Sequence, residues 1–337
     1  MHLSEFDYEL PPELIAQDPL PERDKSRLLV LHRGSGRIEH RFFYNLPDYL
    51  QAGDVLVLNN TRVTAKRLRG VKPTGGKVEV LLLREVAPNK WEALVKPGRR
   101  LEAGTQIVFG DEQLSAQVLA RTPDGGRILD FGQSEEVRGL IESLGEVPLP
   151  PYIRKKLDTP ERYQTIYADE PGSAAAPTAG LHFTPSLLEQ VRAKDVKIAF
   201  ITLDVGIATF RPVKTEFIAD HPMHKERISI SPEAAEAINT ARGRIISVGT
   251  TTVRALESAA VGRHKVAPVD CETELYIMPG FEFKIVDALI TNFHMPRSTL
   301  LILVSAFAGR EKVMRAYDEA KRLKYRFLSF GDAMLII

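Results

Sequence analysis

The sequence Arg244-Ile-Ile-Ser-Val-Gly-Thr-Thr-Thr-Val-Arg-Ala-Leu-Glu257 holds the pattern that decides the fold. An apolar run that ends at Val248 is typical of a buried strand, Gly249 permits a tight turn, and Thr250 can begin a helix that continues toward Ala260. The segment therefore predicts a strand that leads directly into a helix. Repeated alternation of this kind is typical of an α/β domain with a mixed, largely parallel sheet.

Strands and helices alternate on both sides of this segment. Thr184 followed by Pro185 is typical of a helix start, as is Ser231 followed by Pro232. The further elements that we expect are a hairpin of residues 27–32 and 37–43, strands at 54–58, 197–203, 275–278 and 285–290, and helices at 135–144 and after Pro296 and Arg310.

Residues 65–135 have a different pattern. Short β-prone runs at 77–83, 91–95, 105–109, 114–120 and 127–131 are separated by glycine-containing turns. Even spacing of many short strands is typical of a small antiparallel barrel or sandwich. We therefore expect a discontinuous α/β domain, residues 1–64 and 136–337, interrupted by an inserted antiparallel β-barrel domain at 65–135.

The composition excludes several classes of protein. The chain has 337 residues, 44% of them hydrophobic and 26% charged, which is ordinary for a soluble globular protein. Glu5 and Asp7 argue against a signal peptide, and the longest apolar run, Leu300 to Ala308, is too short for a membrane span. A single cysteine, Cys271, excludes an internal disulfide and fits a reducing compartment. We expect a cytoplasmic, monomeric enzyme with no membrane partner.

The loop Pro171-Gly-Ser-Ala-Ala-Ala-Pro-Thr-Ala-Gly-Leu-His-Phe-Thr184 is a candidate ligand site. Its small side chains allow backbone amides to approach a ligand closely. The helix start that follows could attract an anionic group, and His182 could transfer a proton near neutral pH. The alternative is a flexible linker, which rarely leads through a histidine into a capped helix.

The segment Asp220-His-Pro-Met-His-Lys-Glu226 combines carboxylates with imidazoles. Carboxylates adjust the pKa of neighbouring histidines, so the segment could transfer protons or bind a ligand. His221 and His224 are separated by a proline, which disfavours the one-face helical spacing of many zinc sites. We expect no metal, and a plain surface loop is the alternative.

Three strand ends carry further polar candidates. Thr250, Thr251 and Thr252 could bind a phosphate or carboxylate with Arg254 as the counter-charge, although simple helix capping is the alternative. This segment lacks the lysine of a P-loop and the spaced glycines of a dinucleotide-binding loop. The other candidates follow strands at 197–203 and 285–290, where a ligand of a parallel sheet is expected: Asp204, Arg211, Asn292 and His294.

Basic residues could contact RNA. One group lies at the start of the barrel segment and another at 154–156, and each could bind phosphates with release of counterions. A solvated basic face is the alternative. The first group comprises Arg62, Lys66, Arg67, Arg69 and Lys72.

With these motifs assembled, the chain resembles the S-adenosylmethionine:tRNA ribosyltransferase-isomerase family of queuosine synthesis. The matching segments extend from one end of the chain to the other and are specific to that family. They include Asn59-Asn-Thr-Arg-Val63, Gly75-Gly-Lys-Val-Glu-Val80, Pro148-Leu-Pro-Pro-Tyr152, Tyr163-Gln-Thr-Ile-Tyr167, Asp220-His221 with Met223-His224, Val248-Gly-Thr-Thr251, Asn292-Phe-His294, Leu303-Val-Ser-Ala-Phe-Ala308 and Gly331-Asp-Ala-Met334.

The resemblance implies an α/β domain interrupted by a barrel and a specific reaction. The ribosyl group of S-adenosylmethionine is transferred to 7-aminomethyl-7-deazaguanine in tRNA and isomerised, which gives epoxyqueuosine and releases adenine and methionine. S-adenosylmethionine is thus a substrate, and no cofactor is expected.

The resemblance also implies roles for individual residues. The acid–base candidates are His182, His224 and His294, with Glu226 or Asp220 as orienting carboxylates. The expected contacts with S-adenosylmethionine are Pro177, Thr178, Ala179 and Gly180, and the basic residues at the barrel edge are the expected tRNA contacts.

The chain departs from the family pattern at one segment. Asp204 and Ala208 stand where the family usually has histidine and glycine. If that histidine contacts substrate, the aspartate changes the rate or the roles of its neighbours. Two other functions remain open: an RNA methyltransferase that uses S-adenosylmethionine, disfavoured by the missing glycine-rich loop, and a non-catalytic RNA-binding protein, disfavoured by the few aromatic residues of the barrel.

Overall fold

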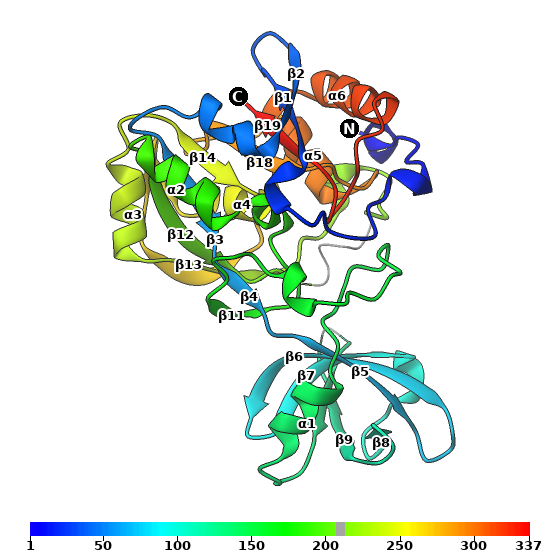
Figure 1. Cartoon of the computed structure of the whole chain (residues 1–337). Coiled ribbons are helices and arrows are strands. Elements are labelled where there is room, and N and C mark those ends of the chain that lie inside the picture. The colour runs from blue at the N-terminus through cyan, green and yellow to red at the C-terminus, as the bar shows by residue number, and fades with distance from the viewer. Residues whose placement is uncertain (124, 207–212) are drawn as a thin grey trace. The chain divides into compact units, whose positions relative to one another are not determined.

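The computed structural model describes residues 1–123, 125–206 and 213–337. Arg211 and Ala208 therefore lie outside the described residues. The chain divides into two compact units, one of Met1–Thr61, Pro150–Glu170 and Ala176–Ile337, and one of Arg62–Leu149 and Pro171–Ala175. The first unit contains a large sheet and most of the helices, and the second contains a barrel (Figure 1).

The sheet of the first unit is mixed. Its four central strands β12-β3-β14-β18 are parallel to one another, and β1 is parallel to β19, whereas the remaining pairs are antiparallel. The nine strands follow one another in the order β17 (Val269–Thr273), β13 (Glu226–Ile230), β12 (Lys197–Leu203), β3 (Val55–Asn59), β14 (Ile245–Val248), β18 (Ala288–Asn292), β19 (Ala333–Ile336), β1 (Arg27–Leu31) and β2 (Ile38–Phe42). The predicted α/β class is confirmed, with a smaller parallel part than expected.

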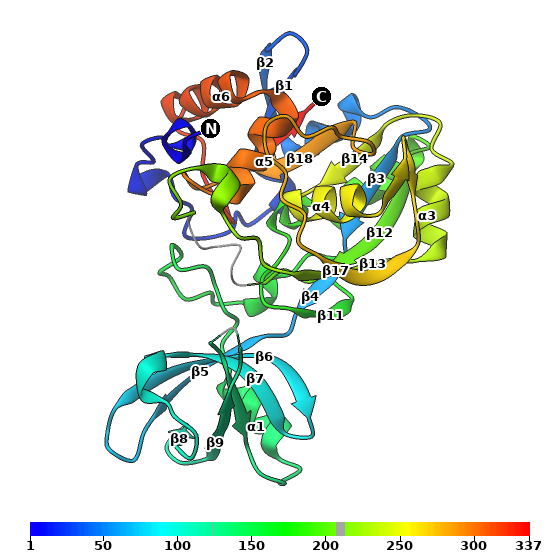
Figure 2. The same cartoon turned by 180° about the vertical axis from the view of Figure 1, so that it is seen from behind.

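Helices cover both faces of this sheet. α2 (Pro185–Ala193) lies over one face, and α4 (Thr250–Ser258) and α5 (Thr299–Ala308) lie over the other (Figures 1 and 2). Alternate strand residues on the face that α2 covers, such as Leu56 and Ile246, form a buried core with Leu187 and other apolar residues of α2. Both faces of the central strands are buried, as is usual where a parallel sheet lies between helices.

The predicted caps begin these helices. Thr184 Oγ1 accepts a hydrogen bond from the Leu187 amide at 3.2 Å, and Ser231 Oγ accepts one from Ala234 at 3.2 Å. Side-chain caps satisfy amides that have no partner inside the helix. The other helices of the first unit are α3 (Pro232–Asn239) and α6 (Arg310–Arg322).

The second unit is a closed antiparallel barrel, as predicted. Apolar residues that alternate along its strands, such as Val80 and Leu129, fill the interior. The strands follow one another in the order β10 (Arg127–Asp130), β7 (Lys90–Lys96), β6 (Lys77–Ala87), β5 (Lys66–Val71), β8 (Gln106–Phe109) and β9 (Leu114–Arg121).

Helix α1 (Val137–Leu144) belongs to the barrel unit, whereas the sequence pattern predicts that residues 136–149 belong to the α/β domain. Val137 and Ile141 are each only 2% exposed and pack into the barrel core. Because the helix buries its apolar face in the barrel core, it is part of the barrel unit.

Several strands differ from the expectation. Residues 275–278 are not a strand, and the edge strand β17 lies just before them. The predicted strand at 285–290 begins later, as β18. The sequence pattern does not predict β5 or the C-terminal β19; β5 includes Lys66, Arg67 and Arg69 of the proposed RNA contact.

None of the helices in the described ranges is both long enough and apolar enough to cross a bilayer.

The remaining elements are short. The short strands are β4 (Thr61–Val63), β11 (Glu170–Ser173), β15 (Ala260–Gly262) and β16 (Lys265–Val266), and the 3₁₀ helices are η1 (Leu3–Phe6), η2 (Pro12–Leu14), η3 (Arg23–Lys25), η4 (Phe43–Tyr49), η5 (Gly98–Arg100), η6 (Pro160–Tyr163), η7 (Thr178–His182) and η9 (Ile218–Asp220).

Asp54 fixes the beginning of the parallel centre. Its buried carboxylate accepts from the Arg244 amide at 2.8 Å and from Arg244 Nη2 at 2.7 Å, and also from the Gln51 amide at 2.9 Å. Arg244 immediately precedes β14, so this contact sets β14 beside β3. Removal of one partner of a buried ion pair leaves the other charge without compensation.

We expect Asp54→Ala to lower the free energy of unfolding by about 3 kcal/mol. Urea denaturation measures this value. The matched control is Asp318→Ala, because the Asp318 carboxylate is 68% exposed in its pair with Lys321; its effect should stay below about 0.5 kcal/mol. Equal effects of the two changes would contradict the role of Asp54.

Candidate functional site

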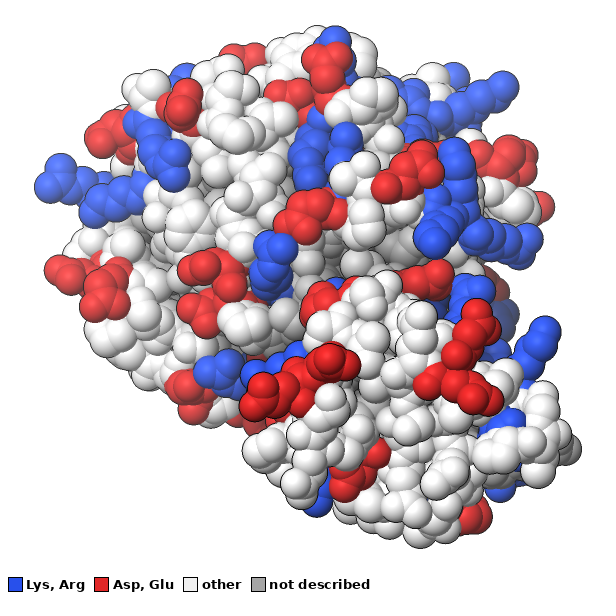
Figure 3. Space-filling view, turned by 60° about the horizontal axis from the view of Figure 1, so that its bottom comes forward, with Lys and Arg blue, Asp and Glu red and all other residues white. Residues whose placement is uncertain are grey.

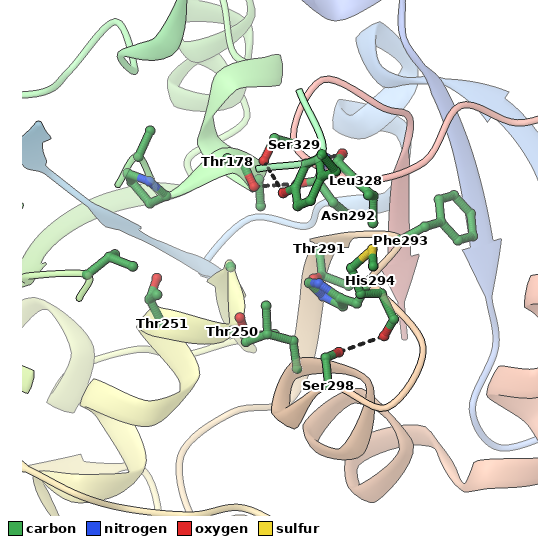
Figure 4. A pocket seen from close by; sticks show the side chains of 18 residues that line it. Thr178, Thr250, Thr251, Thr291, Asn292, Phe293, His294, Ser298, Leu328 and Ser329 are labelled. Atoms are coloured by element: carbon green, nitrogen blue, oxygen red, sulfur yellow. Dashed lines mark hydrogen bonds between the residues drawn. The ribbon is translucent and has the colours of Figure 1, made fainter. Parts of the chain in front are cut away.

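A cavity lies at the carboxyl edge of the parallel strands. Residues that directly follow β12, β14 and β18 form much of its wall, and the alanine-rich loop and residues 328–329 complete it (Figure 4). Ligands of α/β sheets bind at this edge. The lining residues are Tyr152, Ala176, Pro177, Thr178, Ala179, Val205, Gly249, Thr250, Thr251, Thr291, Asn292, Phe293, His294, Met295, Ser298, Leu300, Leu328 and Ser329.

The amide of Asn292 is held in one orientation. Its Nδ2 donates to the Leu328 carbonyl at 3.2 Å, and its Oδ1 accepts from Thr178 Oγ1 at 3.3 Å. A carbonyl oxygen can only accept, so Leu328 determines which end of the amide is nitrogen. Nδ2 also lies 3.2 Å from His182 Nε2. Asn292 is therefore buried with defined partners at the cavity wall.

His182 lies behind Asn292. Because Asn292 Nδ2 is a donor, His182 Nε2 accepts, and the proton of the neutral ring is on Nδ1, which donates to Ser26 Oγ at 2.7 Å. The ring stacks on Phe43 with 4.9 Å between centroids. Burial lowers the pKa of His182 to about 3, and the positive charges of Arg23 and Arg326 lower it further in the same direction.

The sequence suggested that His182 would meet the ligand directly. It lines a smaller neighbouring cavity with Ser26 and Arg23, and it is not among the described residues that line the cavity at the strand ends. Its ring supports Asn292, which does line that cavity. His182 therefore reaches this cavity only through its hydrogen bond with Asn292.

His294 lines the cavity itself and is only 9% exposed. Its Nε2 lies 2.7 Å from Thr291 Oγ1, while its backbone donates to Tyr317 Oη at 2.9 Å and accepts from Tyr8 Oη at 2.5 Å. Burial lowers the pKa of His294 to about 3. The threonine hydroxyl can donate to Nε2 or accept from it; in the tautomer in which Nε2–H donates, Nδ1 carries the lone pair.

A second cavity adjoins the first, and the two share Thr250, Thr251 and Leu300. Glu226 and Arg254 form a buried ion pair in its wall. Glu226 Oε1 also accepts from the Gly206 amide at 2.9 Å, and Arg254 Nε donates to the Leu275 carbonyl at 2.9 Å. The other lining residues are His221, Met223, His224, Leu275, Tyr276, Ile277, Thr299 and Leu303.

The Asp220–Glu226 segment does not form a single cluster. His224 is exposed at the second cavity, Asp220 is exposed, and Glu226 is buried against Arg254. Over the described ranges, no group of three or more His, Cys, Asp and Glu side chains is placed to hold a metal ion. The buried carboxylate is available to the second cavity, whereas Asp220 is not among its described lining residues.

The alanine-rich loop contributes Ala176, Pro177, Thr178 and Ala179 to the lining of the cavity, and much of the loop is also buried. Ala175 is fully buried and Ala179 belongs to the core under α2. A Cβ on Gly180 would lie 2.1 Å from Tyr167 Oη, so this glycine makes room for Tyr167 and not for a ligand. The beginning of α2 does not contribute to the lining given above; the beginning of α4 does.

Asp204 and Thr252 lie close to the cavity but point elsewhere. Asp204 accepts from Thr61 Oγ1 at 2.8 Å and lies 3.7 Å from Arg227; burial raises the pKa of its carboxyl group. Thr252 Oγ1 donates to the Val248 carbonyl at 2.8 Å inside α4. Val205 and Thr251, their neighbours in sequence, line the cavity instead.

The proposed RNA-contacting side chains are largely paired within the barrel unit. Lys66 contacts Glu142 at 2.5 Å, Arg67 lies 3.6 Å from Glu79, and Arg69 lies 3.3 Å from Glu146. Figure 3 shows Lys and Arg interspersed with Asp and Glu over the face that it draws. Arg62 has partners as well, and Lys72 lies beside Gly76.

For several lining residues, nothing in the local sequence indicates that they belong to a ligand site. Ser298 reads as a helix cap, Tyr152 as part of a rigid connector, and Tyr276 as part of a strand. Leu328 has a positive φ of 71°, which is rare for a side chain that is not glycine, and its carbonyl holds Asn292. Only the folded chain brings these residues to the strand ends.

Known proteins match this chain over its whole length. A family model described as queuosine biosynthesis protein matches residues 3–336. A protein of Moorella thermoacetica is 56% identical over 342 aligned residues, and one of Symbiobacterium thermophilum is 55% identical over 341; each match covers 100% of both chains. Both relatives are named S-adenosylmethionine:tRNA ribosyltransferase-isomerase.

A solved structure is similar as well. The crystal structure of an S-adenosylmethionine tRNA ribosyltransferase from Thermotoga maritima is 43% identical, with a TM-score of 0.56 over 99% of this chain and 100% of that one. With the match of the family model and the identity of the full-length relatives, the assignment is clear: the chain belongs to the queuosine biosynthesis protein family.

Proposed function

We propose that this chain is an S-adenosylmethionine:tRNA ribosyltransferase-isomerase. The observation that carries the proposal is the match, at more than half of all positions and over 100% of both chains, with relatives of that name. The reaction is the transfer and isomerisation of the ribosyl group of S-adenosylmethionine onto 7-aminomethyl-7-deazaguanine in tRNA. It gives epoxyqueuosine and releases adenine and methionine.

S-adenosylmethionine occupies the cavity at the strand ends in this proposal. The walls are mostly apolar, with hydroxyl and amide groups from Thr178, Thr250 and Asn292 at defined places, a combination that suits a nucleoside. The molecule is consumed, so it is a substrate and no resident cofactor is needed. A cytoplasmic location and a monomeric state remain our expectation for an enzyme that acts on tRNA.

His294 is our candidate for the catalytic base. The positive sulfur of S-adenosylmethionine acidifies the neighbouring C5′–H bond, and a neutral imidazole can accept that proton. The lowered pKa keeps His294 neutral at pH 7 and also weakens it as a base. Proton transfer therefore depends on the acidity that the sulfonium confers on C5′. The acid that assists departure of adenine is then a group other than His294. His224, the remaining acid–base candidate with an exposed ring, lines the adjoining cavity.

In this proposal, basic side chains of the barrel unit bind the phosphates of the tRNA. The Arg69 side chain is 72% exposed in its pair with Glu146. Exposed ion pairs contribute little free energy, so a phosphate can replace the carboxylate. We assign to this contact Arg62, Lys66, Arg67, Arg69 and Lys72.

The direct test is incubation with S-adenosylmethionine labelled in the ribose and tRNA that bears the aminomethyl-deazaguanine base. We expect label in the tRNA and release of adenine and methionine in equal amounts. Release of S-adenosylhomocysteine would instead establish methyl transfer. Binding of both substrates without any product would contradict the proposed reaction. Asp204, which stands where the family usually has histidine, would then be the first residue to replace.

We expect His294→Gln to lower kcat by roughly 100-fold or more, because loss of a general base has effects of this size. The glutamine amide can keep the contact with Thr291 and has no basic nitrogen. KM for S-adenosylmethionine should change by less than about threefold, since the lost interaction belongs to the transition state.

The matched control is His32→Gln. His32 contacts Glu39 in the hairpin of β1 and β2, outside both cavities. Its kcat should equal that of the unchanged protein. A wild-type kcat for His294→Gln would remove His294 from the mechanism.

Two buried imidazoles also predict how stability depends on pH. His182 and His294 have their pKa values lowered from 6.5 to about 3 in the folded chain. Between these values the unfolded chain binds protons that the folded chain does not, so stability falls as the pH falls below 6.5. Each imidazole should contribute a slope of about 1 kcal/mol per pH unit.

Urea denaturation at pH 7, 6 and 5 measures this slope. His182→Gln and His294→Gln should each reduce it by about 1 kcal/mol per pH unit relative to the unchanged protein. Slopes that are the same in all three proteins would show that neither buried ring remains neutral in the folded state.

A further inference from the structure

We infer that the second cavity binds the amino-acid end of S-adenosylmethionine, with Arg254 and Tyr276 holding its carboxylate and Glu226 its ammonium group. This inference rests on the proposed function, because it assigns one half of the same substrate. The other half, the adenosine, lies in the cavity at the strand ends.

One hydrogen-bond donor of the Arg254 side chain lacks a partner among the described residues. Its side chain is only 8% exposed, Nε donates to the Leu275 carbonyl, and Nη1 contacts Glu226. Nη2 is buried without a hydrogen-bond partner in the described part of the chain. A buried guanidinium nitrogen that lacks a partner costs free energy, and a carboxylate is the group that best satisfies it.

Tyr276 offers a second donor without a partner. Its hydroxyl is buried and makes no hydrogen bond among the described residues, and its ring lines the same cavity. Burial raises the pKa of Tyr276 to about 12, so the hydroxyl keeps its proton and can only meet a carboxylate as a donor. Two unsatisfied donors of this kind in one wall indicate an acceptor that binds there.

The charges of the cavity fit a zwitterion. Glu226 and Arg254 already compensate each other, so a ligand with a single net charge would leave one charge unbalanced in a buried place. An amino-acid group carries an ammonium and a carboxylate side by side. It can meet Glu226 and Arg254 together and keep the site neutral.

The two cavities meet where the two halves of the substrate are joined. Thr250, Thr251 and Leu300 belong to both walls. The sulfonium joins the two halves of the substrate, so it lies at this shared wall, with adenosine on the side of Asn292 and His294.

The test compares S-adenosylmethionine with its decarboxylated analogue, which keeps the adenosine, the sulfonium and the amine. Calorimetric titration measures both affinities without turnover. We expect the intact protein to bind S-adenosylmethionine at least roughly 30-fold more tightly, since a charged hydrogen-bonding partner is lost in the analogue.

Tyr276→Phe removes one of the two donors and nothing else. The affinity for S-adenosylmethionine should fall by roughly tenfold, and that for the analogue should not change. Because the hydroxyl makes no hydrogen bond to the residues that the structure describes, the free energy of unfolding should not fall. Tyr44→Phe, at a side chain that is 45% exposed, is the matched control and should alter neither affinity.

The outcomes separate the two proposals. Failure of the intact protein to bind S-adenosylmethionine would overturn the proposed function, and this inference with it. Equal binding of the two compounds would overturn the carboxylate assignment alone. An equal loss of both affinities in Tyr276→Phe would do the same, because it would show that the tyrosine acts through packing.

Discussion

The site depends on the in-register parallel pairing of β3 with both of its neighbours. Val55 pairs with Lys197 of β12 and with Ile245 of β14, so the three strands run in the same direction and their carboxyl ends reach one edge. Asn59 extends this pairing past its last backbone partner, Ile201, through side-chain hydrogen bonds to Leu203. Without that constraint, the polar residues that follow each strand would not line one cavity.

Burial then determines what those polar residues can do. His182 and His294 stay neutral because the interior disfavours their charged forms, and each ring has a hydroxyl partner that fixes its orientation. Asn292, held by three groups, cannot turn its amide. The cavity wall is therefore organised before any substrate arrives, which lowers the reorganisation that catalysis requires.

Local sequence predicted the local structure well. Thr184 and Ser231 cap the helices for which they were chosen, the hairpin of β1 and β2 forms, and the barrel closes. What local sequence could not show was the partner of each side chain. Ser26 lies 156 positions from His182, and nothing near His182 indicates that its ring supports an amide instead of meeting a ligand. Edge strands such as β17 were missed for the same reason, because their pairing is a long-range property.

The barrel segment has a consequence for the order of folding. β3 ends at Asn59 and its neighbour β12 begins at Lys197, so pairing of these strands must close a very long loop. The entropy lost on closure grows with the length of disordered chain. A barrel whose strands pair mostly with near neighbours in sequence can form first, and it then replaces much of that loop by a compact body. The insertion thereby shortens the conformational search for the central parallel pair.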